Sequence, residues 1–154
     1  MGRASLFCLL VLALALGTAC RASRYTVPPG EQLARLDDVG LSVDVTGLKN
    51  ARRMLSLWCE IANAGPSSLR FARADVVLTV EGRSYPARDV EALDFVVELA
   101  PGQVLGKVWG FHVGRALKHG TYEIRISNIA ALDDGVRQTT DRELVVPVTI
   151  PRGF

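Results

Sequence analysis

Apolar and polar residues alternate along most of the chain beyond residue 38. In the segment 39–46, Val39, Leu41, Val43 and Val45 alternate with small or polar residues. A period of two is typical of a β-strand that buries one face. The same alternation, or a short apolar run between turn residues, predicts further strands over 55–61, 69–71, 75–81, 84–88, 94–99, 105–113, 121–126 and 144–150.

Turn residues separate these segments. Asn63-Ala64-Gly65-Pro66 and Ala100-Pro101-Gly102 each end a predicted strand, and the tight turn at Gly82 predicts a hairpin. The segment 128–140, which is rich in Asp and Gly, is expected to be a loop. Because Pro147 has no amide hydrogen for a ladder, we expect the last strand at a sheet edge or a bulge.

Many short strands at regular spacing, without a convincing amphipathic helix, favour an all-β fold. We expect a single antiparallel β-sandwich over residues 39–151, with a closed barrel as the alternative that the same periodicity allows. The expected core consists of Leu41, Val43, Leu57, Ile61, Phe71, Leu78, Val80, Phe95, Trp109, Phe111, Tyr122, Ile124 and Val146. A chain of this size buries such a core without a disulfide or a metal.

The N-terminus has the three parts of a secretory signal. Arg3 supplies a positive charge, the apolar run 6–16 follows, and small residues lie at 17–19. The run is shorter than the roughly 20 apolar residues that cross a bilayer as a helix. We therefore predict a signal peptide over residues 1–19.

The end of this segment resembles the lipobox of bacterial lipoproteins. Thr18, Ala19 and Cys20 match the small residues and the cysteine of that pattern, whereas Gly17 stands where the family usually has Leu. The resemblance implies that Cys20 is acylated and becomes the first residue of the mature chain. Ordinary secretion, with a cut at the same small residues, is the alternative. In that family Asp after the cysteine marks inner-membrane retention, so Arg21 favours the outer membrane of a two-membrane cell.

Residues 20–38 are expected to form a lipidated tether. Pro28-Pro29-Gly30 suits neither a sheet ladder nor a helix interior, and a short helical turn is possible over 31–36. Of the 18 lysine and arginine residues only Arg3 lies in 1–19, which leaves 17 against 16 acidic residues. This balance gives no reason to expect a nucleic acid as partner. Arg21 and Arg24 could touch anionic headgroups, or could simply be solvated, like Arg52-Arg53.

Few residues point to catalysis or metal binding. His112 and His119 have no accompanying ligand set, so no catalytic zinc site is expected. Cys59 alternates in phase with Leu57 and Ile61, which predicts a buried thiol instead of a nucleophile. If Cys20 is not acylated, it could instead form a disulfide with Cys59. We expect no cofactor and no enzyme activity.

Two features are weak candidates for ligand binding. Asp133 and Asp134, with Asp141 further on, could contribute to a calcium site, but they fall short of the six to eight oxygens that calcium takes. A solvated turn is the plainer interpretation. Trp58 lies on the strand face opposite Leu57 and Cys59, so it is either a surface contact for a glycan or protein, or packing beneath the tether.

A second resemblance spans residues 55–126. Its order is Asn63-x-Gly65, Leu69-Arg70-Phe71, the strand 76–80, Phe95, Leu99-Ala100-Pro101-Gly102, Trp109–Phe111 and Gly120-Thr121-Tyr122. This order resembles the immunoglobulin-like modules of bacterial surface lipoproteins and, more faintly, a family of proteinase-inhibitor sandwiches. The matching positions form turns and strand ends, so they imply a fold and carry no activity.

Together these features predict an exported, lipid-anchored envelope protein. Its immunoglobulin-like β-sandwich is expected to bind an unidentified envelope protein or to act in assembly. The alternatives are a module that binds glycan or calcium, and a proteinase inhibitor on the same scaffold.

Overall fold

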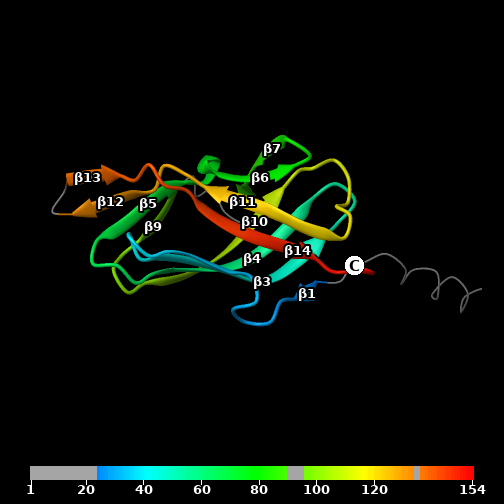
Figure 1. The fold of residues 1–154 in the computed structure, drawn as a ribbon, viewed down its shortest axis with the longest axis horizontal. Coiled ribbons are helices and arrows are strands. Elements are labelled where there is room, and N and C mark those ends of the chain that lie inside the picture. Colours follow the sequence, from blue (N-terminus) through cyan, green and yellow to red (C-terminus); the bar gives the residue numbers. More distant parts are fainter. Residues whose placement is uncertain (1–23, 90–95, 134–135) are drawn as a thin grey trace, which may run out of the picture.

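A computed structural model of the chain describes residues 24–89, 96–133 and 136–154. The predicted signal peptide, Cys20, Phe95 and Asp134 lie outside these ranges. Within them the chain is almost entirely strand and turn, and the one helical element is the 3-10 turn η1 (Arg73–Asp75). The predicted all-β fold is therefore confirmed, and Figure 1 shows its layers.

The first sheet combines four strands from the start of the described chain with two from its middle. Its order is β1-β3-β4-β10-β8, and β2 also pairs with β3. All of these pairs are antiparallel. The strands are β1 (Tyr25–Thr26), β2 (Leu33–Leu36), β3 (Leu41–Asn50), β4 (Leu55–Asn63), β10 (Val104–Phe111) and β8 (Arg88–Asp89).

Two further antiparallel sheets complete the fold. The second has the order β14-β11-β6-β7, with β14 (Leu144–Ile150), β11 (Gly120–Ile126), β6 (Val76–Val80) and β7 (Arg83–Pro86). The third has the order β13-β12-β5-β9, with β13 (Val136–Thr139), β12 (Ala130–Asp133), β5 (Ser68–Ala72) and β9 (Val96–Leu99). Figure 1 shows the second sheet over the first, and the β12–β13 hairpin extending beyond the sandwich at one end.

One core cluster joins the sheets. Trp109 and Phe111 from the first sheet and Ile124 and Val146 from the second are all buried in it. Every described member of the predicted core is buried except Tyr122, which is half-buried and donates a hydrogen bond from its hydroxyl to the Lys118 carbonyl (2.9 Å). The polar tip of Tyr122 therefore reaches the surface while its ring packs against the core.

Two segments differ from the sequence expectation. Part of the expected tether joins the first sheet as β1 and β2, and β2 occupies the place of the suggested helical turn. The expected loop over 128–140 contains the β12–β13 hairpin, in which Asp133 pairs with Val136. Both segments are strands because they complete hydrogen-bonded ladders with neighbours, not because of a strong pattern of their own.

Strand β14 lies at a sheet edge, as Pro147 predicts. The edge is partly covered by Gln32, which is 4% exposed. Its side-chain oxygen accepts from the Thr149 amide (3.2 Å), and its side-chain nitrogen donates to the Thr149 carbonyl (3.4 Å). The Gln32 amide thus takes the place of a neighbouring strand and closes part of this edge.

Candidate functional site

Three turns and both described chain ends meet at one end of the sandwich, which we call the basic end. It comprises Arg24, the β3–β4 turn (51–54), the β6–β7 turn (81–83), the loop 112–119 and the C-terminal residues 151–154. The registers bring them together, because Tyr25 pairs with Leu48 near the end of β3, and Gly120 pairs with Ile150 at the end of β14.

The loop 112–119 fastens these turns to one another. The Gly114 amide donates to the Arg53 carbonyl (3.1 Å), and His119 Nδ1 donates to the Ile150 carbonyl (2.8 Å). Asn50 and Leu117 form two hydrogen bonds, from Asn50 Nδ2 to the Leu117 carbonyl (2.8 Å) and from the Leu117 amide to Asn50 Oδ1 (2.9 Å). Because Asn50 and Leu117 are buried, the backbone of this end has a fixed shape.

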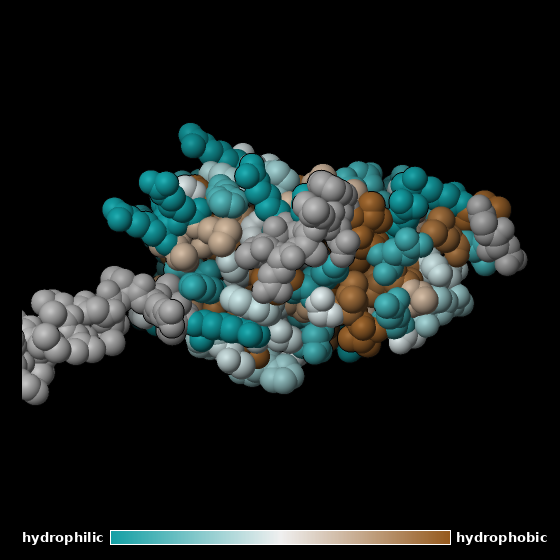
Figure 2. Space-filling model, turned by 180° about the vertical axis from the view of Figure 1, so that it is seen from behind, coloured by the Kyte–Doolittle hydropathy of each residue, from teal (hydrophilic) through white to brown (hydrophobic). Residues whose placement is uncertain are grey.

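The side chains of the basic end carry a strong excess of positive charge. Its exposed cations are Arg24, Arg52, Arg53, Arg83, Arg115, Lys118 and Arg152. The single acidic side chain in these segments, Glu81, forms an ion pair with Arg115 (2.6 Å). The hydrogen bond from Arg115 and the positive charge of Arg115 lower the pKa of Glu81. The same hydrogen bond and the negative charge of Glu81 raise the pKa of Arg115. Figure 2 shows hydrophilic side chains projecting at this end, on the left.

Both described chain termini lie at this end. The rings of Tyr25 and Phe154 meet edge to face, with their centroids 5.6 Å apart, and the C-terminus lies close to β1 in Figure 1. Both residues are half-buried and pack against the core. Strand β1 begins at Tyr25, five residues after Cys20. Its contact with Phe154 and with the core keeps it in the folded domain.

Trp58 lies on the outer face of the first sheet and is half-buried. The guanidinium carbon of Arg24 lies 4.2 Å from the centre of its ring. Gly47, which pairs with Trp58, leaves room for this arrangement, since a Cβ there would lie 2.7 Å from Arg24 Nε. Arg24 thus covers one face of the indole and leaves it less open as a stacking platform for a glycan.

Cys59 is buried, as the strand alternation predicts. Burial, with a contribution from the negative charge of Asp44, raises the pKa of its thiol. This shift is opposite to the one that activates a nucleophilic cysteine. A thiolate at Cys59 would also have no route to a substrate.

The weak calcium candidates that the structure describes are not brought together. Asp133 lies at the tip of the β12–β13 hairpin, opposite Val136, whereas Asp141 follows the base of the hairpin, beyond Thr139. The tip and the base of the hairpin are three residue steps apart, from Val136 to Thr139, which is about 10 Å. His112 and His119 are both exposed. In the described part of the chain, no group of three or more metal-ligating side chains could hold an ion.

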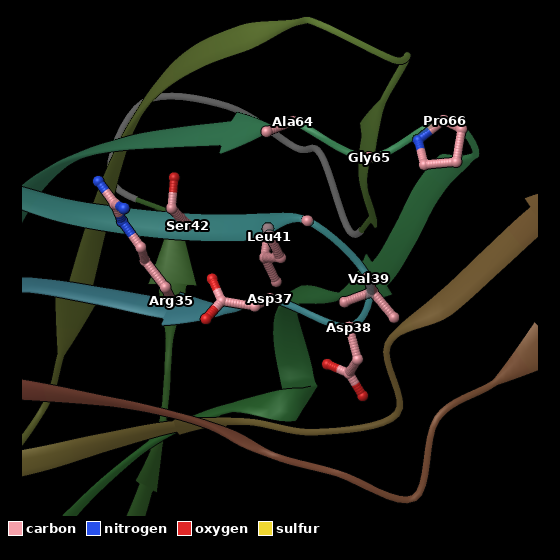
Figure 3. A pocket seen from close by; sticks show the side chains of 10 residues that line it. Arg35, Asp37, Asp38, Val39, Leu41, Ser42, Ala64, Gly65 and Pro66 are labelled. Carbon is pink, nitrogen blue, oxygen red and sulfur yellow. The ribbon is translucent and has the colours of Figure 1, made fainter.

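An open pocket of about 460 Å³ lies at the opposite end of β3 from the basic end. Its lining includes Arg35, Asp37 and Ser42 on one side and Ala64 to Pro66 on the other, as Figure 3 shows. The Asp38 carboxylate points away from the Ala64–Pro66 side and forms an ion pair with Arg142 (3.4 Å). Asp38 is therefore engaged away from that side, and the remaining charged side chains of the lining are Arg35 and Asp37.

Strand β13 is an exposed sheet edge. All four of its residues are exposed, Val136 by 60%, and its one strand neighbour in the third sheet is β12. Every second amide and carbonyl of an edge strand faces outward, available to another chain. Figure 1 shows this hairpin at the end of the molecule opposite β1 and the C-terminus.

Neither the basic end nor the β13 edge is predicted from the sequence. The cations of the basic end come from segments far apart in the chain, and only the adjacent pair Arg52-Arg53 gives a local signal. For β13, Asp-Gly at 134–135 between two short segments was a usable hairpin signal.

No helix within the described ranges is long and apolar enough to cross a membrane.

Comparisons with known proteins identify a similar fold. No protein-family model matches the chain, and no curated protein sequence matches it. The crystal structure of a "putative lipoprotein (ycdA)" from Bacillus subtilis subsp. subtilis str. 168 is similar, with a TM-score of 0.50 and 12% sequence identity. The match covers 81% of this chain and 38% of that one. At this identity the likeness shows the fold, so the chain is an all-β protein similar in architecture to part of that molecule.

Proposed function

We propose that this chain is an exported lipoprotein of a bacterial envelope, anchored through Cys20, whose immunoglobulin-like β-sandwich binds another protein and performs no catalysis. In a cell with two membranes, Arg21 after the cysteine favours the outer membrane. The lipobox-like residues 18–20 support the anchor, and the similarity in fold to a protein described as a lipoprotein agrees with it.

The observation that carries the binding function is the position of β13. This exposed edge lies at the opposite end of the molecule from β1, and therefore from the proposed anchor. An extended segment of a partner protein could add to the third sheet beside β13, with main-chain hydrogen bonds for affinity. The exposed side chain of Val136 would give that segment an apolar contact.

The buried Cys59 supports a role without catalysis. Its thiol is enclosed in the core and its pKa is raised, so the one cysteine of the described chain is unsuited to nucleophilic attack. The scattered positions of Asp133 and Asp141 likewise favour protein binding over a calcium site.

The anchor is tested on the N-terminal peptide. Mass spectrometry of the membrane fraction should find acyl chains on Cys20, and Cys20→Ser should move the protein to the soluble fraction. An unmodified peptide that begins at Cys20, recovered from soluble protein, would establish ordinary secretion instead.

The binding edge is tested by crosslinking in the intact cell. A photoreactive residue at Gln138 on β13 should give an adduct of discrete mass with an envelope protein. The matched control is the same residue at Ser84, which is exposed on the edge strand β7 of the second sheet. Equal adducts at both positions, or none at Gln138, would contradict a specific role for β13.

A further inference from the structure

The basic end lies where the proposed lipid anchor enters the domain. Four peptide steps separate Cys20 from Arg24, so their Cα atoms can be at most about 14 Å apart. Arg24 belongs to the basic end and contacts Trp58. A membrane that holds acyl chains on Cys20 must therefore lie within a short reach of this end of the sandwich, not of the β13 end.

The charges of this end suit an anionic surface. Within the described residues, no carboxylate lies within ion-pairing distance of Arg52, Arg53 or Lys118, nor of Arg152. Among the described residues, Asp38, Glu123 and Glu143 also form ion pairs with arginines, and they belong to other segments. The chain as a whole has a net charge of only +2, so the excess at this end is local.

The backbone holds these cations in a common arrangement. The turn that carries Arg52 and Arg53 is hydrogen-bonded to Gly114 of the loop 112–119, which itself carries Arg115 and Lys118. The Tyr25–Phe154 pair lies at the same end, where Tyr25 directly follows Arg24 in sequence and Phe154 is two residues from Arg152. Aromatic rings are favoured at the headgroup level of a bilayer, next to lysine and arginine.

We infer that the basic end is a docking surface for anionic lipid headgroups, which stands the domain on its own membrane with β13 pointing away. The orientation rests on the proposed anchor at Cys20. An acyl chain fixes the protein to the bilayer but leaves the domain free to tumble. Contact of several cations with headgroups restricts that tumbling and holds the edge strand away from the lipid.

The test uses the chain from Cys20 to Phe154 with Cys20→Ser, which cannot be acylated. This chain retains every described strand and the whole core cluster, so it contains all the parts needed to fold. It is sedimented with vesicles of phosphatidylcholine, alone or with about one-third phosphatidylglycerol, at low and high salt. We expect binding to the anionic vesicles only, and weaker binding at high salt because salt screens exposed charges.

A matched pair of double variants locates the surface. Arg52→Gln with Arg53→Gln removes two cations from the basic end and should weaken partitioning about 30-fold, at ~1 kcal/mol per cation. Arg70→Gln with Arg137→Gln removes the same charge from exposed positions on β5 and β13, and should bind almost as the parent chain does. Circular dichroism checks that both variants are folded.

Three results would overturn the inference. They are equal binding to neutral and anionic vesicles, equal weakening by the two double variants, and binding to a short DNA duplex as tight as to the anionic vesicles. The last would make the basic end a general polyanion site. Because the vesicle assay uses no acyl chain, it can fail while the mass of the Cys20 peptide still proves the anchor, and the reverse also holds.

Discussion

The side-chain amide of Asn63 donates a hydrogen bond to the carbonyl of Leu99, 3.2 Å away. The same nitrogen donates to the Ser67 carbonyl (2.9 Å), and Asn63 Oδ1 accepts from the Gly65 amide (3.0 Å). This occurs where β4 and β10 leave their common ladder and the chain passes to β5 and β9 of the third sheet. One buried side chain therefore satisfies the backbone at the corner between two sheets.

Asn63→Ala should lower the free energy of unfolding by about 3 kcal/mol, because it leaves buried carbonyls without donors. Urea denaturation measures this loss. Gln103→Ala is the matched control at the same corner, since it removes one exposed side-chain bond to the Ala100 amide (2.8 Å). The control should lose about 1 kcal/mol or less, and equal losses in the two variants would contradict the central role of Asn63.

Gly40→Ala should destabilise the domain far more than Gly102→Ala. The two glycines have the same positive φ of 74°, so the cost of a left-handed alanine, about 1 kcal/mol, is common to both. A Cβ at Gly40 would overlap the backbone of Gly65, whereas a Cβ at Gly102 has no atom within 4 Å. Thermal melting of the two variants isolates the effect of the close approach, and similar melting temperatures would show that the segment can move apart.

Stability should fall at high pH through Cys59. Its pKa is raised in the folded state, so the folded chain keeps the proton while the unfolded chain releases it. The contribution of the Cys59 thiol to the free energy of unfolding is fully present below the ordinary thiol pKa of about 8.5. Above that pH it declines by about 1.4 kcal/mol per pH unit. Urea titrations at several pH values should show that Cys59→Ala lacks this component, because both variants share all other titrating groups. Parallel pH profiles would refute it.

Arg24→Ala should expose Trp58. Loss of the guanidinium from the ring face should increase quenching of tryptophan fluorescence by acrylamide and cost about 0.5 kcal/mol of stability. Trp109 is buried and contributes an unchanged background. Arg83→Ala, another exposed cation of the basic end, is expected to leave the quenching unaltered. Arg24→Lys, which keeps a cation near the ring, is expected to fall between the parent and Arg24→Ala.

Strands with one buried face were predictable from the sequence. In β3, β4 and β14 nearly every second residue is buried, so the apolar period follows directly from the structure. The burial of Cys59 and of Trp109 follows from the same period. The edge position of Pro147 needs only its missing amide hydrogen.

Other elements leave no such trace in the sequence. All four residues of β13 are exposed, so no apolar alternation marks it, and it is a strand because β12 supplies a ladder. Strand β1 has two residues, too few for a period. The basic end depends on topology, which gathers Arg24, Arg52 and Arg152 from distant parts of the chain.

The separation of β1 from β13 also determines how the domain would respond to a mechanical force. If a partner at β13 is drawn away from the membrane, tension runs from the anchor to the far tip, roughly along the strands in Figure 1. Inter-strand hydrogen bonds lie across that direction. These hydrogen bonds are then loaded in shear, so that many of them resist the force at the same time. They do not break one after another, as they would if the strands were peeled apart. The weakest link under such a load is the two-residue ladder of β1, beside the Tyr25–Phe154 contact.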